Sequence, residues 1–167
     1  MNPFHIVNRL RPYSDKGANA LLDRLIIPGL IPLARHLKVR VETADDDRCV
    51  LSMPVNRRTR NHLNSMYFGA QMTLIDLTVG VLLFQRFPPG PFGGVIKRVE
   101  TDFRIKAKGL IRCQCQMDLA TIDKLEQVRH NDNGKSEAWL AVELFDKNKK
   151  LVSSARVLVA IKRFGNT

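Results

Sequence analysis

The stretch NHLNSMYFGAQMTLIDLTVGVLLFQRF, residues 61–87, predicts a loop that runs into the longest helix of the chain, over residues 69–87. Apolar residues lie on nearly all sides of that helix, so it should be buried. At 3.6 residues per turn, Gly69, Thr73, Asp76 and Gly80 share one narrow stripe. This stripe of small and polar residues predicts close approach by another backbone, a second subunit or a ligand.

The segments around this helix predict a sheet. Apolar and polar residues alternate over 38–54. This pattern indicates either two strand arms around the acidic turn at 45–47 or one strand with a bulge. The loop FPPGPFGG ends the helix, and a polar loop is expected at 129–135. Four later antiparallel strands are expected, the last two forming a hairpin: 97–108, 110–122, 137–145 and 151–164. A sheet must bury its apolar face, so we predict an α+β fold with about five strands curled around one helix.

Residues 15–37 are expected to be helical and to break at Pro28-Gly29 and at Pro32. We assign 1–167 to a single domain, with a helical extension over 1–37 and a core over 38–163. The first residues lack the apolar segment of a signal peptide, and both long apolar stretches carry charges that oppose membrane insertion. A cytoplasmic protein is predicted, with binding of the leading segment to a membrane surface as an alternative.

The formal net charge of +11 favours anionic partners. Cys49, Cys113 and Cys115 are odd in number, which suits reduced thiols. The spacing of Cys113 and Cys115 places both on one face of a strand, and we expect core residues there. The histidines are scattered, so we predict no metal site.

A carboxylate at Asp76 in such an apolar helix is expected to be buried, and it must then be paired or protonated. One interpretation is a hydrogen bond across a dimer interface. The other is a general base or nucleophile whose pKa is raised by desolvation. The start of the same helix offers unpaired N–H groups that can stabilise negative charge on a carbonyl oxygen, and Gly69 would let a substrate approach them.

These residues resemble the signature of the hotdog-fold acyl-CoA thioesterases. In that family an Asn lies in the loop, His-Gly-Gly opens the central helix, and an acid follows about two turns later. Asn61, Gly69 and Asp76 match the Asn, the second Gly and the acid, and VETDFRIKAKG is similar to the strand after the helix. Tyr67 and Phe68 stand in place of the His and the first Gly.

The resemblance implies a hotdog fold with helical additions before it, and hydrolysis of a thioester. The carbonyl would lie over the amides of Gly69 or Ala70, with Tyr67 offering a hydroxyl donor. Asn61 would position the acyl group or the water, and Asp76 would activate water or attack directly. The site would be built between two subunits, in a homodimer or a dimer of dimers. No cofactor is implied beyond the coenzyme A of the substrate, and an acyl carrier protein is an alternative carrier.

The positive charge suggests sites for the phosphates of coenzyme A. One candidate is the loop bearing Arg57, Arg58 and Arg60, which directly precedes Asn61. The other is one face of the predicted 97–108 strand, which carries Arg104, Lys106 and Lys108. We favour the arginine loop because it adjoins the predicted site.

Three other functions compete with hydrolysis. A protein that binds acyl-CoA without cleaving it is favoured by Tyr67 in place of the family His. A nucleic-acid-binding protein is supported only by charge, and the sequence lacks the motifs of such proteins, so we predict no nucleic acid as partner. A dehydratase would need a His, and only His62 lies near the motif.

Overall fold

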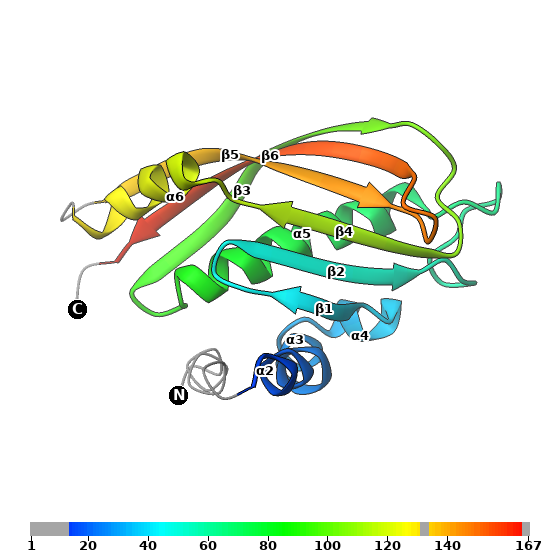
Figure 1. Ribbon diagram of the computed structural model, residues 1–167, viewed down its shortest axis with the longest axis horizontal. Coiled ribbons are helices and arrows are strands. Elements are labelled where there is room, and N and C mark those ends of the chain that lie inside the picture. Colours follow the sequence, from blue (N-terminus) through cyan, green and yellow to red (C-terminus); the bar gives the residue numbers. More distant parts are fainter. Residues whose placement is uncertain (1–13, 131–133, 165–167) are drawn as a thin grey trace.

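The computed structural model describes residues 14–130 and 134–164. Its centre is a curled six-stranded antiparallel sheet with the strand order β1-β2-β4-β5-β6-β3 (Figure 1). The acidic turn at 45–47 joins two separate strands, as the first of the two sequence interpretations proposed. The strands are β1 (Arg40–Ala44), β2 (Arg48–Pro54), β3 (Phe92–Phe103), β4 (Leu110–Gln116), β5 (Lys135–Phe145) and β6 (Leu151–Arg163).

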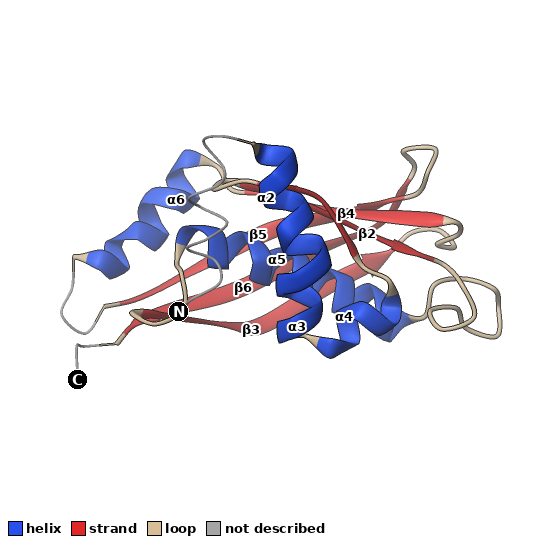
Figure 2. Cartoon of the chain, turned by 90° about the horizontal axis from the view of Figure 1, so that it is seen from below, coloured by secondary structure: helices blue, strands red, loops and turns tan. Residues whose placement is uncertain are grey.

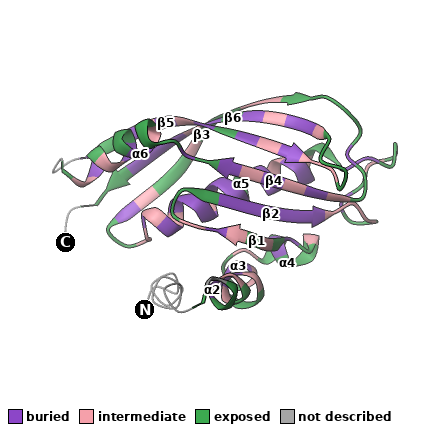
Figure 3. Cartoon of the chain, in the orientation of Figure 1, coloured by how far each residue is buried: buried purple, intermediate pink, exposed green. Residues whose placement is uncertain are grey.

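Helix α5 (Phe68–Arg86) lies in the hollow of this sheet, which confirms the predicted hotdog arrangement. Most of its residues are buried, as Figure 3 shows along its length. α5 is long and apolar enough to cross a membrane by composition alone, but 61% of its most apolar window is buried inside the protein. The sheet therefore supplies the apolar surroundings that this helix needs.

The third strand has the predicted length of 12 residues but lies five residues earlier in the chain, at 92–103 instead of 97–108. β3 ends at Phe103, and residues 104–109 form a loop that runs beside the segment before α5. Its backbone is held there by hydrogen bonds from Met66 N–H to Ala107 O (2.9 Å) and from Val55 N–H to Gly109 O (2.6 Å). The expectation that Lys106 and Lys108 project from one face of a strand is therefore wrong.

The predicted strand over 110–122 is too long. β4 ends at Gln116, and Asp118 caps a helix that the sequence analysis missed, α6 (Leu119–Glu126), by accepting a hydrogen bond from Thr121 N–H (2.8 Å). A short 3-10 turn, η2 (Gln127–Arg129), follows. Part of the polar loop expected at 129–135 lies outside the described residues.

The leading segment is helical, but only one of its two predicted breaks occurs. The helices continue through Pro28 and Gly29 and break at Ile31 (φ −129°, ψ 87°). Seen from below in Figure 2, they cross the side of α5 that the sheet leaves uncovered. The elements are α2 (Asp15–Leu21), the π-helical turn η1 (Leu22–Ile26), α3 (Ile27–Leu30) and α4 (Pro32–Leu37).

The two edges of the sheet differ. β1 has 5 residues, and the Asp23 carboxylate of η1 accepts hydrogen bonds from Val41 N–H (3.0 Å) and from Arg40 Nη1 (2.7 Å). β3 has 12 residues, and within the described ranges no strand pairs with its outer edge. Val95, Val99 and Phe103 of β3 are exposed. A long open edge with apolar side chains is a surface on which another strand can pair.

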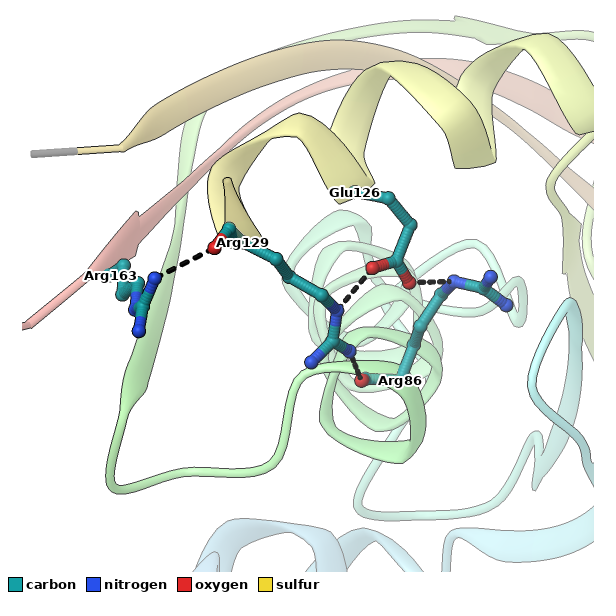
Figure 4. Close-up of polar contacts among 4 residues, drawn as sticks. All are labelled: Arg86, Glu126, Arg129 and Arg163. Carbon is teal, nitrogen blue, oxygen red and sulfur yellow. Dashed lines mark hydrogen bonds and ion pairs between the residues drawn. The ribbon is translucent and has the colours of Figure 1, made fainter. Parts of the chain in front are cut away.

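Arg129 joins the C-terminal end of α5 to α6 (Figure 4). It donates a hydrogen bond to the carbonyl oxygen of Arg86 (2.8 Å) and pairs with Glu126, which also accepts from Arg86 Nε (2.7 Å). Its guanidinium carbon lies 5.1 and 4.9 Å from the ring centroids of Phe87 and Phe92. A cation here satisfies a carbonyl at the negative end of the helix dipole and fixes the turn from α5 into β3.

We predict that Arg129→Ala lowers the free energy of unfolding by about 1–2 kcal/mol, because it removes charge-assisted hydrogen bonds from a partly buried site. Urea denaturation measures the change. Lys124→Ala removes an exposed cation from α6, so its unfolding midpoint should match that of the wild type. Equal midpoints for all three proteins would show that Arg129 does not stabilise the fold.

Candidate functional site

The start of α5 leaves two backbone donors free. Tyr67 occupies the N-cap position without a side-chain cap, and its carbonyl oxygen accepts from Ala70 N–H (3.0 Å) and Gln71 N–H (3.1 Å). The N–H groups of Phe68 and Gly69 make no hydrogen bond in the described part of the chain. The candidate amide of Ala70 is therefore engaged, and that of Phe68, which the sequence analysis did not consider, is available.

Local packing explains why position 69 is a glycine, in addition to any functional role of that glycine. A Cβ atom at this position would lie 2.9 Å from Cε1 of the Tyr67 ring. The exposed Tyr67 ring folds back over the first turn of the helix and covers one side of Gly69. The approach to the free amides is thus bounded by the rings of Tyr67 and Phe68.

Asn61 shapes the loop before the helix. Its Oδ1 accepts hydrogen bonds from Leu63 N–H (2.9 Å) and Ser65 N–H (3.1 Å), and its own N–H donates to Ser65 O (2.8 Å). Ser65 Oγ in turn accepts from Ala107 N–H (3.0 Å). The Asn61 side-chain oxygen is committed to the loop, which leaves the Nδ2 donors for contact with a ligand.

Asp76 lies on the least buried side of α5, as part of the predicted stripe. The expectation that this carboxylate is buried is wrong for the single chain, because the residue is exposed. Within the described residues the carboxylate makes no hydrogen bond or ion pair. Apolar neighbours remove part of its hydration, and this desolvation raises its pKa above the ordinary value. The other members of the stripe, Gly69, Thr73 and Gly80, are partly buried, so Asp76 is its most exposed residue.

Asp76 and the free amides of the same chain are too far apart to act on one carbonyl group. Gly69 and Asp76 are seven residues apart on the same helix, so about 10 Å separates them along its axis at 1.5 Å per residue. A carbonyl oxygen and the water that attacks its carbon must both lie within about 3 Å of their catalytic groups. The geometry therefore requires a second contributor to any hydrolytic site.

A cavity of about 160 Å³ opens beside Asp76. Its walls come from α5, from the first part of β3 and from the leading helices. The lining residues are Ile27, Leu30, Ile31, Asp76, Leu77, Val79, Gly80, Val81, Leu83, Phe84, Gly94, Val95 and Ile96. Asp76 is the one ionisable group among them, and every other lining residue is apolar or glycine.

A second hollow, of about 330 Å³, lies at the start of α5. It brings Asn61 and Phe68 together with Arg104 and Lys106, and the exposed ring of Phe103 borders it. The Phe68 and Phe103 rings meet edge to face with centroids 5.8 Å apart. Lys106, one of the predicted phosphate ligands, thus lies beside the site, although on a loop.

The arginine loop that we favoured does not line this hollow. Arg58 donates a hydrogen bond to His36 O (3.2 Å) at the end of α4, and Arg60 donates to Asn64 Oδ1 (3.2 Å). Arg57, Arg58 and Arg60 are exposed, as is Lys108, and none of these four residues lines the cavity or the hollow.

The buried cysteines take no part in the site. Cys113 and Cys115 point to the same buried face of β4, which confirms the prediction of core residues, and burial raises the pKa of both thiols. Over 14–130 and 134–164, no group of three or more His, Cys, Asp or Glu side chains is arranged to hold a metal ion. His62 is exposed on the loop before α5.

The contribution of the leading helices was missed by the sequence analysis. Ile27, Leu30 and Ile31 line the cavity beside Asp76, whereas the residues of 1–37 had been treated only as an extension. Their apolar character was visible in the sequence. Which part of the core they cover depends on tertiary packing, and the sequence pattern does not specify it.

Several solved protein structures resemble this architecture. A protein of unknown function from Pseudomonas aeruginosa, described as a probable thioesterase, shares 28% identity and a TM-score of 0.76 over 87% of this chain and 96% of its own. A thioesterase from Staphylococcus aureus shares 15% sequence identity with a TM-score of 0.64, and the match covers 78% of this chain and 98% of its own. A thioesterase from Haemophilus influenzae shares 12% sequence identity with a TM-score of 0.63, and the match covers 90% of this chain and 91% of its own. No curated protein matches significantly.

The two low-identity structures support the fold alone, and all three agree with the curled sheet around α5. A family model described as a domain of unknown function, DUF4442, matches residues 24–161. The chain therefore belongs to the DUF4442 family, within the hotdog thioesterase-like superfamily.

Proposed function

We propose that the protein hydrolyses acyl-CoA thioesters at a site shared by two copies of the chain. The observation that carries this proposal is the arrangement along α5: two free amides at its start, and an unpaired carboxylate about 10 Å further on. A second copy in antiparallel orientation brings the Asp76 of one chain to the amides of the other.

The open edge of β3 supports such a pairing. A two-fold axis beside this strand would join β3 to the same strand of the second copy, so that both edges disappear together. The exposed side chains of Val95, Val99 and Phe103 would then be covered. β3 lies next to the exposed side of α5, as its contact between Thr101 Oγ1 and Met72 Sδ (4.0 Å) indicates, so this pairing also brings the two stripes together.

In the proposed reaction the thioester oxygen accepts hydrogen bonds from the N–H groups of Phe68 and Gly69. Asp76 of the second copy takes a proton from water as the water oxygen attacks the carbonyl carbon. The tetrahedral intermediate collapses, the C–S bond breaks, and the thiolate of coenzyme A receives the proton. Direct attack by Asp76 through an anhydride uses the same two chains.

The hollow at the start of α5 is suited to the coenzyme A part of the substrate. Lys106 and Arg104 offer cationic donors for phosphate, and Arg104 Nη2 already donates to Ser154 Oγ (3.3 Å), which orients it. Asn61 Nδ2 and the Tyr67 hydroxyl lie near the same helix start and could bind the pantetheine amides. Coenzyme A would therefore extend over the chain that supplies the free amides, away from Asp76 of the other chain.

A protein that binds acyl-CoA without turnover is a second candidate. It is favoured by the rings of Tyr67 and Phe68, which narrow the approach to the free amides where the related enzymes have His and Gly. Release of free thiol from a panel of acyl-CoA esters separates the two functions.

We predict that Asp76→Asn lowers kcat at least about 100-fold, because an amide cannot take a proton from water. The wild-type activity should fall on acidification through a pKa above the ordinary value of 3.8, and this dependence should be absent from any residual activity of the variant. Thiol release as a function of pH measures both effects.

The control is Asp123→Asn, which neutralises an exposed carboxylate on α6. Its kcat should equal that of the wild type. The fold should tolerate Asp76→Asn, since desolvation disfavours the charged carboxylate in the folded chain. Unchanged turnover in Asp76→Asn would remove this residue from the mechanism.

We predict that Phe68→Pro lowers kcat about 10²–10³-fold, because proline removes one of the two free N–H groups. Proline suits the first position of a helix, and Tyr67 already has the extended backbone (φ −62°, ψ 143°) that a following proline requires. Phe68→Ala removes the same ring but keeps the N–H, so it should retain much more activity. Equal losses in both variants would assign the effect to the ring.

A further inference from the structure

The cavity beside Asp76 has the size and chemistry of a site for a short apolar group. Its volume of about 160 Å³ is close to that of engineered protein cavities of about 150 Å³ that bind benzene. Asp76 is the one lining residue whose side chain can form a hydrogen bond. A ligand that carried a polar group deep into the cavity, away from Asp76, would find no side-chain partner to replace its hydration there.

Gly80 makes room for this cavity. It lies one turn after Asp76 on the same stripe, and a Cβ atom built on it would meet nothing within 4 Å. Gly94 of β3, which also lines the cavity, has the Cδ1 atom of Leu83 3.7 Å from its own Cβ position. A side chain at position 80 would therefore occupy space that the cavity now leaves empty.

The leading helices form the opposite wall. Ile27 is buried, whereas Leu30 is 54% exposed and stands at the rim. Both residues belong to α3, and Ile31 follows that helix, so the leading helices supply one wall of the cavity. Its position one turn from the carboxylate is where the tail of an acyl group would lie if its carbonyl carbon were held opposite Asp76.

We infer that this cavity holds the acyl tail, that the leading helices limit the tail to about six carbons, the number in the benzene that a cavity of this size binds, and that the substrates are uncharged short-chain or aryl acyl thioesters. This inference rests on the proposed hydrolytic function and names its substrate class. The two chains then divide the substrate: one holds coenzyme A beside its helix start, and the other holds the acyl group beneath its leading helices.

The test compares acetyl-, hexanoyl- and hexadecanoyl-CoA as substrates of the full-length protein. The wild type should have its highest kcat/KM with hexanoyl-CoA, because each methylene group buried is worth roughly a fourfold gain. Gly80→Leu should fill the cavity and lower kcat/KM for hexanoyl-CoA at least about tenfold relative to acetyl-CoA. This variant should fold, since glycine is a poor helix former and the new side chain enters open space.

Leu30→Ala should open the wall and raise the relative kcat/KM for hexadecanoyl-CoA. Leu33→Ala is the matched control, because Leu33 is 52% exposed on the next helix and does not line the cavity. Its chain-length profile should be that of the wild type. An unchanged profile in Gly80→Leu would overturn the assignment of the cavity and leave the hydrolytic function standing.

Binding of 1-hexanol, followed by ligand-observed NMR, tests the cavity without turnover. The wild type and Leu33→Ala should bind it equally, and Gly80→Leu at least about tenfold more weakly. This result without hydrolysis of any acyl-CoA would support the cavity as an apolar ligand site and contradict the thioesterase function. Equal binding by the wild type and Gly80→Leu would contradict the cavity assignment.

Discussion

The sheet can wrap α5 on every side except one, and this restriction determines where chemistry is possible. A curled antiparallel sheet with two edges covers the apolar surface of the helix and leaves a strip between β1 and β3. The leading helices cover part of that strip. What remains carries Gly69, Thr73 and Asp76, which are small or polar enough to lie at a surface that another body approaches, while Gly80 lines the cavity beside them. The unburied carboxylate is therefore a consequence of incomplete wrapping.

The same restriction separates the reactive groups. A straight helix places its free amides at one end and Asp76 two turns along, and no rotamer change can bring them together. The proposal of a shared site rests on this fixed separation together with the long open edge of β3. The leading helices add a third element, because they supply one wall of the apolar cavity beside Asp76. Each functional feature thus depends on a surface that the sheet fails to cover.

The sequence was sufficient for the features that periodicity encodes. The apolar run predicted α5, the turn at 45–47 predicted the β1–β2 hairpin as one of two options, and the alternation of Cys113 and Cys115 predicted their burial. The alternating pattern gave a wrong prediction for the residues after Phe103, where a tertiary hydrogen bond takes the place of pairing with another strand. Ala107 O accepts from Met66 N–H, so the alternating residues after Phe103 form a loop. Helix α6 was missed because its eight residues begin only two residues after β4, with no glycine or proline between, and only the Asp118 cap marks its start.

The site was predicted unevenly for a related reason. Asn61, Gly69 and Asp76 belong to one local segment, and the structure keeps them on one loop and one helix. The positions of the basic residues depend on how distant segments meet: Lys106 lines the hollow at the start of α5, whereas Arg58 donates a hydrogen bond to the end of α4. The cavity wall could not be assigned, because nothing in the pattern of residues 27–31 states which face of α5 they cover.

The most direct test of the shared site is complementation between two inactive variants. Asp76→Asn supplies an intact helix start, and Phe68→Pro supplies an intact acid, so neither forms a working site with a copy of itself. If the two chains are unfolded together and refolded at equal concentration, mixed dimers contain one complete site each, and activity should recover to about one quarter of the wild type. No recovery, in a mixture shown to contain mixed dimers, would contradict a site built from two chains.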